Sequence, residues 1–117
     1  MIQIATSLKT IPLMNVNEGI NLDNSNKNTI TGNTANNNTT DGILLTNNSS
    51  SNKIIGNTIN GNGEDGIFLN AVSNENDVFV NRAFGNGVLP FFDIENLGTN
   101  NFKGNKCDTS NQPNICN

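Results

Sequence analysis

Residues 41–59 read DGILLTNNSSSNKIIGNTI, and this stretch decides the fold because its pattern returns at residues 65–83. The second copy, DGIFLNAVSNENDVFVNRA, keeps the acid, the glycine and the apolar positions at a 24-residue step. An earlier copy begins with EGINL at residues 18–22. A fixed period of 20 to 50 residues is the signature of a solenoid, in which each repeat stacks on the next.

Apolar residues alternate with other residues over short runs in each copy, which is the period of a strand and not of a helix. Four columns of inward-facing residues follow: Ile20, Ile43 and Ile67; Leu22, Leu45 and Leu69; Ile30, Ile54, Val78 and Phe102; and Ala35, Ile59, Ala83 and Cys107. Three short strands and three turns in each repeat predict an all-β fold. We expect a parallel β-helix of about four 24-residue coils, stacked ~4.8 Å apart.

Asparagine is the outlier of the composition, with 28 of 117 residues. Asn33, Asn57, Asn81 and Asn105 recur at the 24-residue step. Side-chain amides placed once per coil can donate and accept along the stack, so these four residues predict a structural ladder at a partly buried bend.

The chain divides into three parts. Residues 1–14 fit the period badly and are expected to form an N-terminal cap or partial coil. We expect residues 15–106 to form the β-helix and residues 107–117 to form a C-terminal capping loop. A bare strand edge at the N-terminal end would invite self-association.

The fourth coil departs from the pattern, because a step of 24 from Leu69 reaches Asp93, a poor core residue. A slip of one residue places Phe92 and Ile94 in the core instead. Terminal repeats are commonly irregular, so Phe91 and Phe92 are expected to close the end of the core.

Cys107 and Cys116 are the two cysteines, with eight residues between them. A disulfide here would add about 2.5–3 kcal/mol in the loop-entropy treatment and would indicate an extracytoplasmic setting. The alternative is two free thiols in a frayed tail. The start of the chain lacks the pattern of a signal peptide, so either a leader has been removed or the chain is a fragment.

The net charge of −4 and the lack of a basic stripe argue against a nucleic-acid partner. No apolar run approaches the ~20 residues needed to span a bilayer, so we expect no membrane span.

The runs Gly-Ile-x-Leu and Asn-x-x-Ile-x-Gly-Asn resemble the right-handed parallel β-helix repeats of pectate-lyase-like proteins and of the carbohydrate-binding and sugar-hydrolase repeat group. The resemblance covers residues 15–106. It implies a right-handed coil, with the four ladder asparagines in left-handed backbone conformation at a corner. Residues 101–116 resemble the closing segment of Bacillus-type secreted β-helix proteins.

The motifs that carry activity in this group are missing. Polygalacturonase-like hydrolases use paired Asp motifs and Ser-His-Gly, whereas this chain has no His, and Glu64-Asp65 is a partial echo of the Asp pair. Pectate lyases use Ca²⁺ with a basic residue and nearby arginines, and Arg82 is the single Arg. Copper-associated periplasmic members would need His or Met ligands, and the chain has Met1 and Met14.

An acid column is the remaining candidate for chemistry. Glu18, Asp41 and Asp65 share one position of the repeat, and Glu64 adjoins the last. Carboxylates ~5 Å apart could form a glycosidase pair or bind Ca²⁺. The interpretation we favour is ordinary turn chemistry on a solvated corner. Phe68 faces outward and could stack on a sugar ring.

Two functions remain. We expect a non-catalytic, structural or glycan-interacting module of an extracellular or cell-surface protein. The alternative is the C-terminal part of a polysaccharide lyase or glycoside hydrolase whose catalytic coils lie upstream. No cofactor is expected, with Ca²⁺ at the acid column left open.

Overall fold

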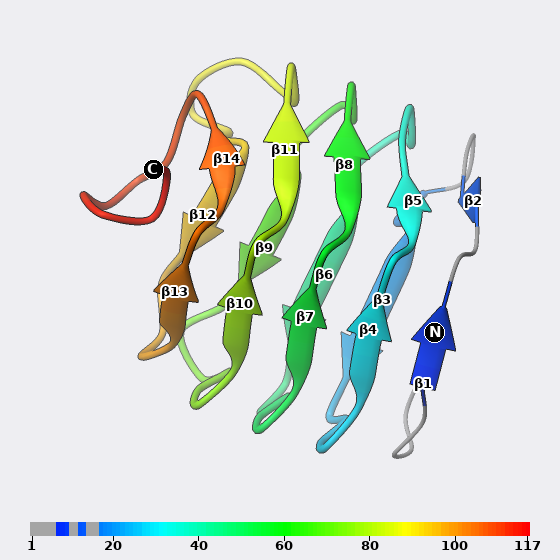
Figure 1. Ribbon diagram of the computed structural model, residues 1–117, viewed down its shortest axis with the longest axis vertical. Coiled ribbons are helices and arrows are strands. Elements are labelled where there is room, and N and C mark those ends of the chain that lie inside the picture. The colour runs from blue at the N-terminus through cyan, green and yellow to red at the C-terminus, as the bar shows by residue number, and fades with distance from the viewer. Residues whose placement is uncertain (1–6, 10–11, 14–16) are drawn as a thin grey trace.

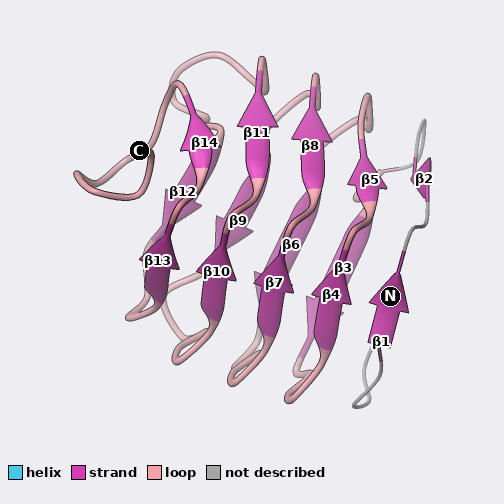
Figure 2. Ribbon diagram, in the orientation of Figure 1, coloured by secondary structure: helices cyan, strands magenta, loops and turns pink. Residues whose placement is uncertain are grey.

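The computed structural model describes residues 7–9, 12–13 and 17–117, and this part of the chain consists of short strands and turns without a helix (Figure 2). Three parallel sheets run along the stack. Sheet A has the order β12 (Ile94–Asn96), β9 (Ile67–Leu69), β6 (Ile43–Thr46), β3 (Ile20–Asp23). The predicted all-β parallel solenoid of about four 24-residue coils is confirmed.

Sheets B and C continue the same coils (Figure 1). Sheet B has the order β1 (Ser7–Lys9), β4 (Thr29–Thr31), β7 (Lys53–Ile55), β10 (Asp77–Phe79), β13 (Asn101–Lys103). Sheet C has the order β14 (Lys106–Cys107), β11 (Arg82–Phe84), β8 (Thr58–Asn60), β5 (Thr34–Ala35), β2 (Pro12–Leu13). In the regular coils each strand therefore pairs with the strand three elements later, one coil along.

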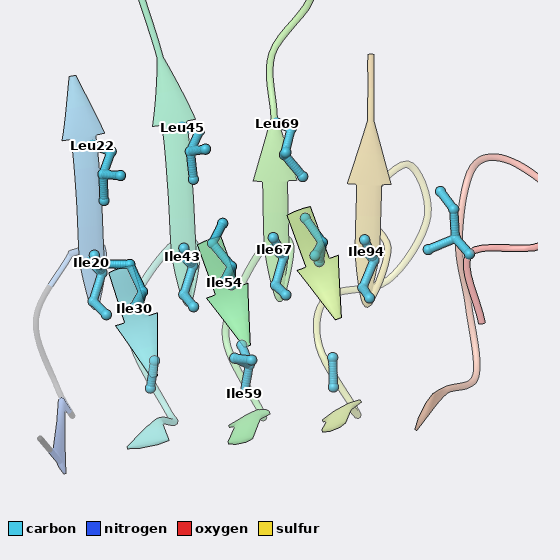
Figure 3. Packing of buried hydrophobic residues seen from close by; sticks show 14 residues of the cluster. Ile20, Leu22, Ile30, Ile43, Leu45, Ile54, Ile59, Ile67, Leu69 and Ile94 are labelled. Carbon is cyan, nitrogen blue, oxygen red and sulfur yellow. The ribbon is translucent and has the colours of Figure 1, made fainter. Parts of the chain in front are cut away.

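The core is a set of columns that the 24-residue period predicts. Ile43 pairs with Ile67 and Leu45 with Leu69 in sheet A, and Ile54 pairs with Val78 in sheet B. The isoleucine and leucine side chains of these pairs point into the space between the sheets (Figure 3), and all six residues are fully buried. Slipping the register by one residue would turn every one of them to the solvent, so burial on one face fixes the register.

Close approach of successive coils explains the glycine that follows each acid. A Cβ on Gly42 would overlap the Ile59 side chain and would lie 2.7 Å from the Gly66 carbonyl oxygen. The backbone passes so near the core here that a side chain has no room.

At the corner between sheets B and C, the left-handed conformation expected for the ladder asparagines is found at a different residue. The residue with positive φ is the one before each ladder asparagine: Gly32, Gly56 and Gly104, with φ of 67°, 68° and 67°, and Val80 with φ of 50°. The ladder asparagines do not adopt this conformation. Glycine tolerates it freely, which leaves the asparagine outside the left-handed region with its amide turned inward.

The fourth coil also differs from the sequence prediction. Ile94 pairs with Ile67 and Asn96 with Leu69, a 27-residue step. Ile94 is buried, but it occupies the Ile67 position and not the Leu69 position, and Phe92 is only half-buried. Extra residues between Gly87 and Phe92 are offset by a correspondingly shorter turn after Asn96, so Val78 still pairs with Phe102 at the 24-residue step.

The C-terminal segment lies against the last coil. Cys107 and Cys116 form a disulfide, and Ile115 is buried in the core cluster. The Ile94 N–H donates to the Thr109 carbonyl at 3.2 Å, which adds a partial fifth layer to sheet A. At the other end β1 and β2 pair with β4 and β5, while the rest of the predicted segment 1–14 lies outside the described residues.

Candidate functional site

Buried polar side chains form ladders along the solenoid. Each ladder has one member per coil, and each member after the first accepts hydrogen bonds at Oδ1 from the backbone N–H and side-chain amide of the coil before it. The described ladders are Asn28–Asn52–Asn76–Asn100, Asn33–Asn57–Asn81–Asn105 and Asn38–Asn62–Asn86–Asp93. A serine ladder joins Ser25, Ser49 and Ser73.

Asn57 illustrates how completely a ladder amide is satisfied. Its Oδ1 accepts from the N–H and Nδ2 of Asn33 at 2.9 and 3.2 Å. Its Nδ2 donates to Oδ1 of Asn81 at 3.0 Å and to the Ile30 carbonyl at 2.9 Å. All four hydrogen-bonding positions of the amide are filled, so the ladder predicted from the period is present and its role is structural.

The acid column also joins successive coils, because its aspartates accept backbone N–H groups at the corner that leads into sheet A. Asp41 Oδ1 accepts the Asp65 N–H at 2.9 Å, and Asp65 Oδ1 accepts the Phe92 N–H of the next coil. Asp41 and Asp65 are 5% and 3% exposed. The solvated corner expected from the sequence is therefore wrong, because these carboxyl groups are enclosed by the coils whose backbone they bind.

Enclosure changes the acidity of both groups. Burial raises the pKa of Asp41 to about 6, opposed by the Asp65 N–H and assisted by Glu64, Glu18 and Glu95. Burial raises the pKa of Asp65 to about 7, against the Phe92 N–H and together with the charges of Glu95 and Asp41. Desolvation dominates because it penalises the charged form of a carboxyl group.

Glu95 is the member of this cluster that sequence reasoning missed. Its negative charge, and a side-chain interaction with Asp65, both raise the pKa of the Asp65 carboxyl group. The 24-residue period does not place Glu95 here, because it arrives through the 27-residue step of the fourth coil. The extra residues before β12, with Pro90 among them, were the signal that could have located it.

The other predicted site residues lie around this corner. Glu18 and Glu64 are half-buried beside Asp41, and Phe68 is half-buried on the outer face of sheet A, paired with Leu44 and Glu95. Within residues 17–117, no group of three or more Asp, Glu, Cys or His side chains is placed to hold a metal ion. What this cluster can do chemically is hold a proton on a buried aspartate at a pH close to neutral.

The outer faces of sheets B and C carry rows of side chains in register from coil to coil. In sheet B, Thr29, Lys53, Asp77 and Asn101 form one row and Thr31, Ile55, Phe79 and Lys103 a second. In sheet C, Thr34, Thr58, Arg82 and Lys106 form a third row. These rows present side chains from successive coils at a regular spacing.

Three stacked parallel sheets with internal amide ladders define a β-helix domain. Residues 8–115 match the family described as NosD, periplasmic copper-binding protein. The chain belongs to this family, whose members are described as periplasmic. Comparisons with curated proteins and with solved structures gave no significant match. In the part of the chain that the structure describes, no helix is long and apolar enough to cross a membrane.

The copper of the family description does not fit the described residues. Copper sites are built from imidazole, thiolate and thioether ligands. The chain has no His, both cysteines are in the disulfide, and Met1 and Met14 lie outside the described residues. In the acid column, the carboxyl groups of Asp41 and Asp65 accept hydrogen bonds from backbone N–H groups.

Proposed function

We propose that this chain is a non-catalytic β-helix module that acts outside the cytoplasm, in the periplasm, in secreted form or at the cell surface, and binds a polysaccharide along its outer faces. The observation that carries the proposal is the register of the outward rows. Thr58, Arg82 and Lys106 occupy one row at successive coils, ~4.8 Å apart.

A regular row of polar groups suits a polymer with a regular repeat, because each further unit of the ligand meets the same kind of contact. The interior supports the same function. The buried asparagines satisfy one another and the backbone, so the outer side chains rest on a rigid support. A pre-ordered surface loses less conformational entropy on binding than a mobile one.

A glycan array probed with the purified chain tests the proposal, with size-exclusion chromatography to report the oligomeric state. We expect binding to at least one polysaccharide class and no chemical change in the bound polymer. Failure to retain any glycan, with the protein folded by circular dichroism, would contradict the glycan-binding function.

The acid column supports the alternative function, in which the chain is the C-terminal part of a polysaccharide lyase or hydrolase. A carboxyl group with a pKa of about 7 has the acidity that suits general acid–base catalysis at neutral pH. Its burial argues against access to a substrate, since Asp65 is 3% exposed. Turnover of a uronate polymer with Ca²⁺ that is abolished by Asp65→Asn, a substitution that keeps the acceptor for Phe92, would establish the enzyme instead.

A further inference from the structure

We propose that the corner between sheets B and C is a binding site for an anionic polysaccharide, centred on Val80. The inference rests on the proposed glycan-binding function and assigns its ligand class and surface. We call this surface the Val80 face and define it as Phe79, Val80, Arg82, Phe84, Lys103 and Lys106.

The topology brings these six residues together from two successive coils. Phe79 ends β10, and Arg82 and Phe84 lie on β11 of the same coil. In the next coil Lys103 pairs with Phe79 and Lys106 pairs with Arg82. Alternation along each strand turns the five strand residues of the face outward, because Val78, Ala83 and Cys107 occupy the inward positions.

Val80, at the centre of the face, has a positive φ that β-branched residues rarely adopt. The equivalent corner residues are Gly32, Gly56 and Gly104, whereas Val80 adopts φ of 50°. A β-branched residue in this region is a genuine outlier, and such strain gathers at functional positions. The Val80 side chain is 53% exposed and leans over Gly104, where a Cβ would lie 2.9 Å from Val80 Cγ1. The strained residue therefore adds an apolar group to the surface and not to the core.

Positive charge surrounds this apolar centre. Arg82, Lys103 and Lys106 are exposed, and none of them forms an ion pair within the described part of the chain. The Arg82 guanidinium carbon lies 5.5 Å from the centroid of the Phe84 ring, which orients the cation over an aromatic face. The outward carboxylate on β10 belongs to Asp77, whose Oδ1 accepts from Asn101 Nδ2 at 3.0 Å.

These features point to the ligand by charge and shape. The chain has a net charge of −4, so a local excess of cations is a departure from its average surface. Cations arranged around half-buried rings suit a polymer of sugar rings that carry carboxylate or sulfate groups, because each ring offers an apolar face to Phe79 and Phe84 while its anion meets a cation. Placement in a periplasmic family favours a glycan over a nucleic acid.

Carboxymethylcellulose and hydroxyethylcellulose are suitable probes because they share a backbone and differ in charge. Affinity electrophoresis and calorimetry of the full chain at two salt concentrations would measure binding. We expect the charged polymer to bind, the neutral one to bind at least about tenfold more weakly, and added salt to weaken the interaction. The double variant R82Q/K106Q should lose about tenfold in affinity, while K27Q, an exposed lysine in a turn outside this face, should stay within about twofold of the wild type.

The outcomes distinguish a failure of the proposed glycan-binding function from a failure of the Val80 face as its site. No binding to any glycan would contradict the proposed function itself. Binding of hydroxyethylcellulose as tight as that of carboxymethylcellulose, or equal losses in R82Q/K106Q and K27Q, would leave the proposed function standing and overturn the Val80 face. Binding to anionic phospholipid vesicles or single-stranded DNA as tightly as to carboxymethylcellulose, with the same loss in R82Q/K106Q, would overturn the assignment to polysaccharide. Circular dichroism of each variant confirms that the fold is retained.

Discussion

Asp93 completes the third amide ladder by accepting two hydrogen bonds from Asn86. Its Oδ1 receives the Asn86 N–H at 3.0 Å and the Asn86 Nδ2 at 2.9 Å, as an asparagine of a further coil would do. Its Oδ2 receives the N–H groups of Asp108 and Thr109 at 3.0 and 3.1 Å. Asp93 occupies the position of Gly66 in the preceding coil, where a Cβ would meet the Asn86 side chain. The ladder thus ends at a carboxylate, which accepts hydrogen bonds and donates none.

Replacing Asp93 tests this ending of the ladder. Asp93→Ala removes acceptors for four N–H groups, and we expect a loss of about 3–5 kcal/mol in the free energy of unfolding. Asp93→Asn keeps Oδ1 but presents an NH₂ group to two donors, so we expect a smaller loss of about 2 kcal/mol. Urea unfolding measures both. A result in which Asp93→Asn is as stable as the wild type would mean that Oδ2 contributes nothing.

Asn57→Ala tests the interior of a ladder. The substitution removes the four hydrogen bonds of the buried Asn57 amide, including the one to the Ile30 carbonyl, and we expect a loss of about 2–4 kcal/mol. Asn101→Ala is the matched control, because its exposed amide makes one surface bond to Asp77, and it should cost less than about 0.5 kcal/mol. Equal losses in urea unfolding would argue against a special role for the ladder.

The regular coils could be predicted from the sequence because a single period fixes both the columns and their register. Ile43 and Ile67 are both buried and pair with each other, and a one-residue slip of the register would turn one of them to the solvent. The fourth coil could not be predicted in this way. Residues 91–95, FFDIE, offer several alternations, and the choice among them is made by pairing with β9 and by the C-terminal segment, which are contacts distant in sequence.

The same limit applies to the candidate site. The repeat placed Asp41 and Asp65 in one column, and their backbone bonds follow from that position. Glu95 entered the cluster through an insertion that no period reveals. Val80 was equally hidden, because local preference assigns glycine or asparagine, and not a β-branched residue, to a corner with positive φ.

Val80→Gly should stabilise the protein. Glycine adopts the φ of this corner without strain, as the residue does in three other coils, and the gain is reduced by the greater freedom of glycine in the unfolded chain. We expect an increase of roughly 0.5–1 kcal/mol in the free energy of unfolding. Gly56→Val is the reciprocal variant and should destabilise, although open space surrounds the position. A stabilising Gly56→Val would contradict the account of strain.

The disulfide should hold the C-terminal segment against the core. Cys107→Ser with Cys116→Ser frees the segment that carries Ile115, and we expect a loss of about 2.5–3 kcal/mol from the loop-entropy relation. Wild-type protein in reductant should show the same loss, whereas the double variant should not respond to reductant. A wild type whose urea midpoint is unchanged by reduction would show that packing of Ile115 alone retains the segment.

The raised pKa values of Asp41 and Asp65 make stability depend on pH in an unusual direction. Both pKa values lie above the ordinary 3.8, at about 6 and about 7, so the folded state holds protons that the unfolded chain has released. The free energy of unfolding should therefore fall as pH rises from about 4 to about 7 and become level above that. The chain has no His, so no imidazole contributes in this range.

Urea unfolding at pH 5 and pH 8 measures the effect, and we expect the protein to be less stable at pH 8 by on the order of 2 kcal/mol. Asp65→Asn keeps the acceptor for the Phe92 N–H and cannot ionise, so most of the fall should disappear in this variant. Asp108→Asn, at an exposed residue, should keep the full dependence. An undiminished fall in Asp65→Asn would mean that the buried carboxyl group beside Glu95 is not the one that binds the proton.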